Sequence, residues 1–161
     1  MMTVPAEREK TLYEMCYMGC ALTHCISADF DLDTDIMKTF DRSFHIKEKL
    51  LAKFGKNWYK GFHDKGGTCI ASGPFPFDIF GIRRVMVFSL VTKAQRGDVP
   101  SPEDMKEALY ILRKQCEKYG IRKIAVPKTG CGFDELRWDD ICTLIDMIFK
   151  GSGIHIVICN P

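Results

Sequence analysis

A lysine and a glycine-rich loop carry most of the chemistry that this sequence can offer. Lys93 closes a nearly all-apolar run, and the segment Pro127-Lys-Thr-Gly-Cys-Gly-Phe-Asp134 follows a second apolar run at residues 123–126. A lysine at the end of a buried strand is partly desolvated, which favours its neutral, nucleophilic form. Gly130 and Gly132 let backbone amides approach a ligand closely, and successive amides ahead of a helix suit a phosphate. A solvated strand end and an ordinary turn are the structural alternatives, because neither motif is specific by spacing alone.

A second candidate is the stretch Ser27-Ala-Asp-Phe-Asp-Leu-Asp-Thr-Asp-Ile36, in which every second residue from the third onward is an aspartate. Asp31, Asp33 and Asp35 match the first three ligand positions of an EF-hand calcium loop. The sixth position is an isoleucine instead of glycine, and the twelfth is Arg42 instead of glutamate. We therefore expect a solvated acidic loop whose last members favour the N-terminus of the following helix. A cation that bridges these acids to phosphates is the alternative.

Cysteine and histidine residues form a third candidate, as ligands of zinc: Cys16, Cys20, His24 and Cys25. They lie along two consecutive strand-like segments, so their side chains would point to different faces. The remaining cysteines are scattered, several of them through apolar runs, and residues 1–10 are too polar for a signal peptide. We expect reduced thiols that mostly pack in the core, and no metal site.

Composition predicts one globular domain with its own core. The chain has 161 residues, of which 46% are hydrophobic and 27% charged, and its net charge is +2. A chain of this length buries about two thirds of its unfolded surface. The charge is too small to indicate nucleic-acid binding, and no apolar run approaches the roughly 20 residues of a membrane span. We expect a tail at residues 1–10, a domain over residues 11–161, a cytoplasmic or nuclear location, and no membrane or direct nucleic-acid partner. The oligomeric state stays open.

The first half of the chain is expected to contain strands at residues 11–17 and 21–26, around a turn at Gly19. Apolar spacings close to three and four predict a helix over residues 35–53, capped by Asp33 or Thr34 and stopped by Gly55. Residues 57–67 are expected to be a loop. Strands are expected at residues 68–71 and 84–92, with a turn at residues 73–77 between them.

The second half predicts strands and helices in alternation. Ser101-Pro-Glu-Asp104 combines a hydroxyl cap, a proline at the first helical position and acids in the first turn. The helix that it starts is expected to run to residue 119 and to stop at Gly120. A strand at residues 123–126, a helix at 138–149 closed by Gly151, and a strand at 154–159 follow. This order implies a mixed or parallel sheet covered by helices on both sides.

Three segments together resemble a known family in their order and spacing: Ala21-Leu-Thr-His-Cys-Ile-Ser27, Leu90-Val-Thr-Lys93 and Pro127-Lys-Thr-Gly-Cys-Gly-Phe-Asp-Glu-Leu-Arg-Trp138. The chain resembles the macro domains, and within them the terminal ADP-ribose protein glycohydrolase branch. The resemblance runs from about residue 11 to the C-terminus, and its most specific piece is the Gly-Cys-Gly-x-Asp loop with the trailing Trp138. It implies an α/β protein, a three-layer α/β/α macro domain with a mixed central sheet that holds ADP-ribose across the strand ends.

The resemblance also implies roles for single residues. Lys93 would attack the anomeric carbon of the distal ribose and release the modified acidic side chain, while Asp134 would handle the protons. These two side chains must lie close together, because a carboxylate stabilises the charged lysine unless it takes up the proton itself. Ser27 would contact the ligand. The backbone amides of the glycine loop would wrap the diphosphate and distal ribose. These amides belong to Lys128, Thr129, Gly130, Cys131, Gly132 and Phe133. The implied partner is ADP-ribose or an ADP-ribosylated protein, with no cofactor and no metal.

Two departures from the family pattern bear on ligand binding. Where the branch carries Met-Gly-Ala-Gly, this chain has Leu32-Asp-Thr-Asp35, so both glycines are aspartates. At about 6 Å and an effective dielectric of about 20, one such charge against one phosphate charge costs roughly 3 kcal/mol. Where macro domains commonly carry an aspartate for the adenine amino group, Glu14 is the only acid at hand.

Three functions therefore remain open. The first is a mono-ADP-ribosyl hydrolase acting on modified acidic side chains, which the joint presence of Lys93 and Asp134 favours. The second is a reader that binds ADP-ribose or a related nucleotide without turnover. The third is a scaffold that uses an apolar hairpin as a protein contact, through Phe75, Phe77, Ile79 and Phe80. The aromatic residues of segment 57–67 suit an adaptable lid or a plain loop.

Overall fold

The computed structural model describes residues 12–31, 41–77, 80–128 and 136–159. These residues form a five-stranded sheet in the order β2-β3-β1-β4-β5. Four strands run parallel: β1 (Ala21–Ser27), β3 (Arg84–Lys93), β4 (Lys123–Pro127) and β5 (His155–Cys159). At the edge, β2 (Thr68–Pro76) pairs antiparallel with β3. The mixed sheet predicted from the sequence is thus confirmed.

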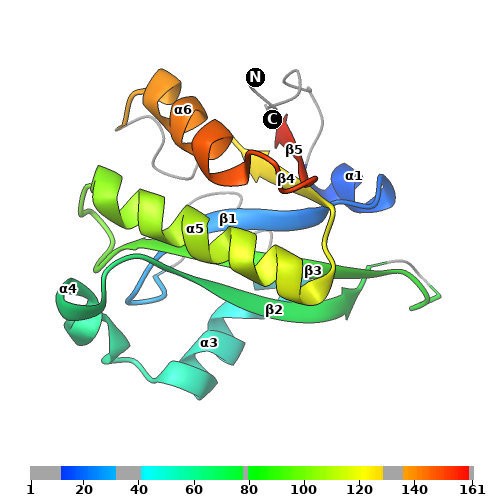
Figure 1. Ribbon diagram of the computed structural model, residues 1–161. Helices are drawn as coiled ribbons and strands as arrows, with labels where there is room; N and C mark the ends of the chain where they lie inside the picture. The colour runs from blue at the N-terminus through cyan, green and yellow to red at the C-terminus, as the bar shows by residue number, and fades with distance from the viewer. Residues whose placement is uncertain (1–11, 32–40, 78–79, 129–135, 160–161) are drawn as a thin grey trace.

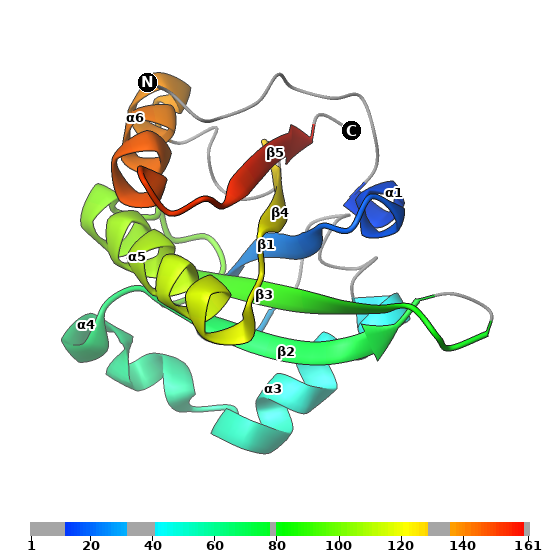
Figure 2. The same cartoon turned by 45° about the vertical axis from the view of Figure 1, so that its right-hand side comes forward.

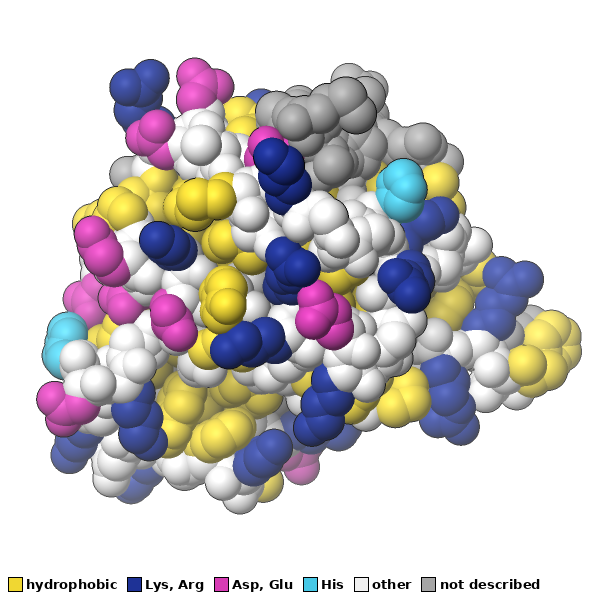
Figure 3. All heavy atoms as spheres, in the orientation of Figure 1, with side chains coloured by type: hydrophobic (Ala, Val, Ile, Leu, Met, Phe, Trp, Pro, Cys, Tyr) yellow, Lys and Arg dark blue, Asp and Glu magenta, His cyan; other side chains and the backbone are white. Residues whose placement is uncertain are grey.

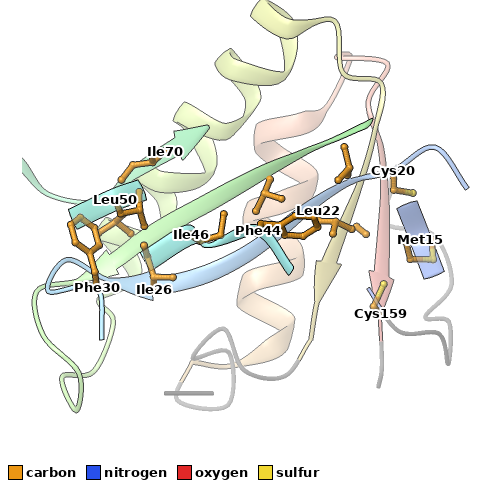
Figure 4. Packing of buried hydrophobic residues seen from close by; sticks show 14 of the residues in the cluster. Met15, Cys20, Leu22, Ile26, Phe30, Phe44, Ile46, Leu50, Ile70 and Cys159 are labelled. Carbon is orange, nitrogen blue, oxygen red and sulfur yellow. The ribbon is translucent and has the colours of Figure 1, made fainter. Parts of the chain in front are cut away.

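Helices cover both faces of this sheet (Figures 1 and 2). On one face, α5 (Pro102–Tyr119) and α6 (Trp138–Phe149) bury a cluster that contains Leu112 and Ile145. On the other face, α3 (Ile46–Phe54) and the short α1 (Leu12–Tyr17) bury a second cluster. Figure 4 shows part of that second cluster, in which Phe30 lies near Leu50 and Ile26. The three-layer α/β/α prediction is therefore confirmed.

The central strand β1 is buried along its whole length although it carries polar side chains. The hydroxyl of Thr23 donates to the carbonyl of Ala125 on β4 at 2.8 Å. On the other side, His24 Nε2 lies 2.7 Å from the Ser89 hydroxyl on β3. Burial lowers the pKa of His24 to about 3, so this ring is neutral at physiological pH. These polar contacts fasten β1 to both neighbouring strands, which fixes where its carboxyl end lies.

The start and end of α5 follow the predicted capping. The Ser101 hydroxyl accepts from the Asp104 amide at 3.1 Å, and Gly120 closes the helix with φ 68°. A carboxylate oxygen of Asp104 also accepts from the Gly67 amide at 3.0 Å. A Cβ at Gly67 would lie 1.9 Å from the Asp104 carbonyl oxygen, so only glycine fits there. The start of β2 is thereby pinned against the start of α5.

Residues 12–17 form α1, so the strand predicted at residues 11–17 is wrong for its described part. Met15 and Cys16 are buried while Glu14 and Tyr17 are exposed, which is a helical pattern that a short apolar run does not reveal. The loop predicted at residues 57–67 is also wrong. It holds a 3-10 helix, η1 (Trp58–Gly61), and one helical turn, α4 (Phe62–Lys65).

Two further boundaries differ from the prediction. Helical structure at residues 41–44 is interrupted at His45, whose backbone is left-handed, before α3 begins at Ile46. Phe44 and Ile46 are both buried, and two positions so close cannot share one helical stripe. The predicted start of this helix, with its caps Asp33 and Thr34, lies outside the described residues. The segment predicted as a turn at residues 73–77 belongs to β2 as far as Pro76, with a register shift after Ser72.

The seven cysteines within the described ranges are buried as thiols. Burial raises the pKa of Cys16 and of Cys116 to about 12, which keeps both thiols protonated and unreactive. Because residues 12–17 are helical, Cys16 lies on α1 whereas His24 and Cys25 lie on β1. Within the described ranges, no three His, Cys, Asp or Glu side chains are grouped to hold a metal. None of the helices described there has the length and apolar character needed to cross a membrane.

Candidate functional site

The expected site lies at the end of the sheet where β1, β3 and β4 finish. Helix α3, which comes after β1 in the chain, covers one face of the sheet, and α6, which comes after β4, covers the opposite face (Figure 1). The ladder between β1 and β4 consists of two residue pairs near the starts of these strands, Ala21 with Ile124 and Leu22 with Ala125. Neighbouring strands whose connections go to opposite faces create the crevice in which open α/β sheets bind ligands.

Two of the predicted site residues are direct neighbours across this end of the sheet. Ser27 and Lys93 are Cα partners in the β1–β3 ladder, with a register shift just before Ser27. Beyond them the strands stay joined, because the Ala28 amide donates to the Lys93 carbonyl at 2.9 Å and the Asp29 amide donates to the Ala94 carbonyl at 3.1 Å. Lys93 is half-buried and Ser27 is buried. The structure thus brings the predicted nucleophile and the predicted ligand contact together.

One carboxylate holds the loops that leave these two strands. Asp29 Oδ1 accepts from the Ser27 hydroxyl at 2.5 Å and from the Asp31 amide at 3.1 Å. Asp29 Oδ2 accepts from the Arg96 amide at 3.1 Å, across from the loop that follows β3. We call Asp29 with these three donors, from Ser27, Asp31 and Arg96, the Asp29 clamp. It fixes the direction of the Ser27 hydroxyl and the path of the chain after Lys93.

The Asp29 clamp also sets the charge of its carboxylate. Burial acts to raise the pKa of Asp29, but the hydrogen bonds from Ser27, Asp31 and Arg96 outweigh it and the pKa lies below its usual value. Asp29 is therefore anionic at neutral pH. An outer ion pair joins the same loops, with Arg96 Nη1 3.5 Å from Asp31 Oδ2. Both of its side chains are about half exposed, so this pair contributes at most about 1 kcal/mol.

Asp29 is the residue of this candidate site that sequence reasoning missed. The sequence-based interpretation treated the aspartates as one solvated acidic loop, and for Asp29 that interpretation is wrong. The signal was present in the spacing, since Ser-x-Asp followed by a turn is typical of side chains that bond to nearby backbone and hydroxyl groups. Asp31, the next member, is solvated as predicted. Asp33 and Asp35 lie outside the described residues.

Lys128 and Trp138 mark the two sides of the glycine loop. The Lys128 amide donates to the Cys159 carbonyl of β5 at 3.0 Å. This amide therefore extends the hydrogen bonding between the ends of β4 and β5 and is not directed at a ligand. The Lys128 ammonium lies 5.2 Å from the centroid of the Trp138 ring, a cation–π contact. The rest of the predicted loop lies outside the described residues: Thr129, Gly130, Cys131, Gly132, Phe133 and Asp134.

Glu14 lies at the wrong end of the sheet to recognise a base at this crevice. It is exposed on α1, which leads into the start of β1, whereas Ser27 ends that strand. The seven residues of β1 separate the two ends by about 20 Å. The residue that would recognise adenine is thus not Glu14.

The aromatic segment at residues 57–67 packs beside the loop that follows β1. The Trp58 ring stacks on Phe30 with centroids 5.5 Å apart and planes 12° apart, and the Phe30 amide donates to the Ser27 carbonyl. Behind Trp58 lies a hollow of about 160 Å³ whose wall includes Phe62 and Ile111. The segment is therefore a packed helical wall next to the site.

Comparison with known proteins places this arrangement in a family. No protein-family model matches the chain. Human ADP-ribose glycohydrolase OARD1 is 25% identical over 143 residues, which cover 89% of this chain and 83% of the relative. The macrodomain of Mycobacterium tuberculosis DarG has a TM-score of 0.71 at 19% identity, covering 100% of this chain and 98% of that one. Thermosipho africanus DarTG in complex with ADP-ribose has a TM-score of 0.66 at 15% identity, covering 94% of this chain and 40% of that one.

The α/β/α layers and the mixed sheet define a macro domain fold, which the structural similarity shows directly. The chain is a macro domain, and the relative that it resembles in sequence along most of its length is an ADP-ribose glycohydrolase.

Replacing Asp29 by alanine should loosen the loops that follow β1 and β3. The variant loses three hydrogen bonds to a carboxylate, so we expect a loss of about 2 kcal/mol in the free energy of unfolding at neutral pH, measured in urea. Faster amide exchange should follow at Asp31 and Arg96. The contribution of Asp29 to the free energy of unfolding should be present above pH 3.8, which is near the pKa of an aspartate in the unfolded chain. It should be lost as the pH falls toward the lower pKa that Asp29 has in the folded protein.

The matched control is Asp31→Ala, which removes the exposed ion pair and should cost less than about 1 kcal/mol. Equal losses for the two variants would show that Asp29 has no special place in these loops.

Proposed function

We propose that this macro domain binds ADP-ribose in the crevice beyond β1, β3 and β4 and hydrolyses mono-ADP-ribosyl groups from modified acidic side chains. The observation that carries the proposal is the position of Lys93. It is half-buried at the end of β3 and is the direct neighbour of Ser27 on the central strand β1. Supporting it, one relative is named an ADP-ribose glycohydrolase and one structural neighbour holds ADP-ribose.

In the reaction, the neutral amine of Lys93 attacks the anomeric carbon of the distal ribose. A carbon–nitrogen bond forms while the ester carbon–oxygen bond breaks, and the modified side chain leaves as a carboxylate. Water then releases ADP-ribose from the lysine, with Asp134 as the group that takes up and returns the protons.

The hydrogen bond from the Ser27 hydroxyl to Asp29 limits the role that Ser27 can have toward a ligand. Its hydroxyl donates to Asp29, so toward a ligand the Ser27 oxygen can only accept a hydrogen bond. Phosphate oxygens are acceptors and cannot be its partner. A ribose hydroxyl can, so we infer that Ser27 contacts a ribose of ADP-ribose and leaves the diphosphate to other groups. The Asp29 clamp keeps this oxygen in a single orientation.

The competing function is a reader or a scaffold without turnover, and the sequence feature that favours it is the pair Asp33 and Asp35. Two carboxylates beside a diphosphate weaken its binding. We infer that they reduce affinity without removing the chemistry, because Lys93, Ser27 and Asp134 are all present.

Replacing Lys93 by alanine should abolish release of ADP-ribose from a protein modified on acidic side chains, with at least a thousandfold loss of rate. Lys93→Arg should be equally inactive, because a guanidinium keeps the charge but does not deprotonate. Release is measured from a radiolabelled or mass-tagged substrate, and binding of free ADP-ribose is measured by calorimetry. Both variants should bind ADP-ribose within a few-fold of the unchanged protein. Release by Lys93→Ala at a tenth of the normal rate or more would remove Lys93 from the mechanism.

Replacing both Asp33 and Asp35 by glycine should tighten ADP-ribose binding by about two decades or more, since it removes two side chains and two charges, each of which opposes a phosphate charge by up to roughly 3 kcal/mol. The double variant with asparagine at these positions removes the charge and keeps the bulk. It should recover most of the gain if repulsion is the cause, and little if steric contact is the cause. Calorimetry at low and high salt separates these effects. Unchanged or weaker binding in the glycine variant would contradict the electrostatic account.

A further inference from the structure

The connection between β2 and β3 projects from the end of the sheet opposite to the candidate site (Figures 1 and 2). It is closed where the Phe77 amide donates to the Arg83 carbonyl at 3.1 Å. Phe80 is 76% exposed and Ile82 is 79% exposed, the highest values among the large hydrophobic residues of the described ranges. Phe80, Ile82, Arg83 and Arg84 are called the hairpin tip below.

Basic groups stand beside this apolar surface. Arg83 and Arg84 are both exposed, and Figure 3 shows the yellow tip flanked by dark-blue Lys and Arg side chains. The Arg83 guanidinium lies 5.9 Å from the centroid of the Tyr17 ring, and that ring meets Phe77 edge-on at 5.1 Å. Tyr17 is itself 53% exposed. The hairpin tip is thus an apolar projection with two guanidinium groups and an aromatic shoulder behind it.

Two nearby explanations for this surface do not fit. It is not part of the nucleotide crevice, because the ten residues of β3 separate Arg84 from Lys93 by about 30 Å. The edge strand β2 next to the hairpin tip is also poorly suited to pairing with the sheet of a second copy. Pro74 and Pro76 lack amide donors, and the β2 register shifts beside them. The hairpin tip therefore offers side chains rather than backbone to a partner.

We propose that the hairpin tip docks the domain on an anionic lipid surface. A convex apolar tip needs either a matching pocket or a medium that deforms around it, and a lipid interface is such a medium. Aromatic and aliphatic side chains backed by arginines are the pattern of peripheral membrane contact, with tyrosine at the headgroup level. The guanidinium groups of Arg83 and Arg84 complement anionic headgroups, and one acid in the connecting sequence, Asp78, offsets part of that charge.

This contact differs from a membrane span. The sequence-based expectation of no membrane partner rested on the lack of a spanning run, which does not bear on a projecting tip. One short apolar tip with two arginines is a weak anchor, so the docking is reversible and weakens at high salt. It leaves the nucleotide crevice facing away from the lipid and does not depend on the proposed hydrolysis.

The test is flotation of the full chain with phosphatidylcholine vesicles that contain about one third phosphatidylserine, beside vesicles of phosphatidylcholine alone. The unchanged protein should float with the anionic vesicles and be released at high salt. The double variants Phe80→Ser/Ile82→Ser and Arg83→Glu/Arg84→Glu should each bind at least tenfold more weakly. The control is Val99→Ser/Met147→Ser, which removes two exposed apolar side chains elsewhere and should bind normally.

Each variant is first shown to unfold at the same urea concentration as the unchanged protein, since all four positions of the hairpin tip are exposed. The proposal is overturned if the unchanged protein binds anionic vesicles no better than neutral ones. It is equally overturned if the hairpin variants float like the unchanged protein, or if the control loses binding as they do.

Discussion

The carboxylate of Asp29 accepts hydrogen bonds from the Ser27 hydroxyl and from the amide of Arg96, which lies 67 positions further along the chain. Through these bonds the loop after β1 and the loop after β3 take one fixed arrangement, and every property proposed for the site depends on it. Lys93 stays beside Ser27 because the backbone on both sides of the pair is tied down. A charged group that is so well supplied with donors is stable in a partly buried place where an isolated carboxylate would not be.

This arrangement depends in turn on a central strand that cannot slide. In β1, Thr23 bonds across to β4 and His24 lies against Ser89 on β3, so a shift in register would leave buried polar groups without these contacts. The parallel pairing of β1 with β3 then brings the ends of these strands together, and α3 and α6 cover opposite faces of the sheet, the arrangement in which open α/β sheets bind ligands beyond their strand ends. The position of Lys93 beside Ser27 thus follows from the topology of the sheet.

Much of the fold could be predicted from the sequence, and the predictions that were wrong have physical causes. Helix α5 was predictable because Ser101, Pro102 and Gly120 act locally, and β3 because its residues are apolar nearly throughout. The predictions were wrong for two short segments, residues 12–17 and 57–67. Both are too short for the spacing of apolar residues to distinguish a helix from a strand or a loop. Lys93 and Ser27 were predicted from the resemblance, and only the register of the ladder shows that they are neighbours. Asp29 was missed because its carboxylate also accepts from the Arg96 amide, and these two residues become adjacent only after folding.

The two ends of the sheet differ: one carries Lys93 and Ser27, and the other carries a projecting apolar tip. The central claim concerns the first, and reductive trapping with borohydride tests it most directly. When the protein turns over a substrate modified on acidic side chains in the presence of borohydride, the lysine-bound ADP-ribose should be captured. Peptide mapping should then find the added mass on Lys93. Continued release with no captured adduct, or with the adduct on another lysine, would contradict the account.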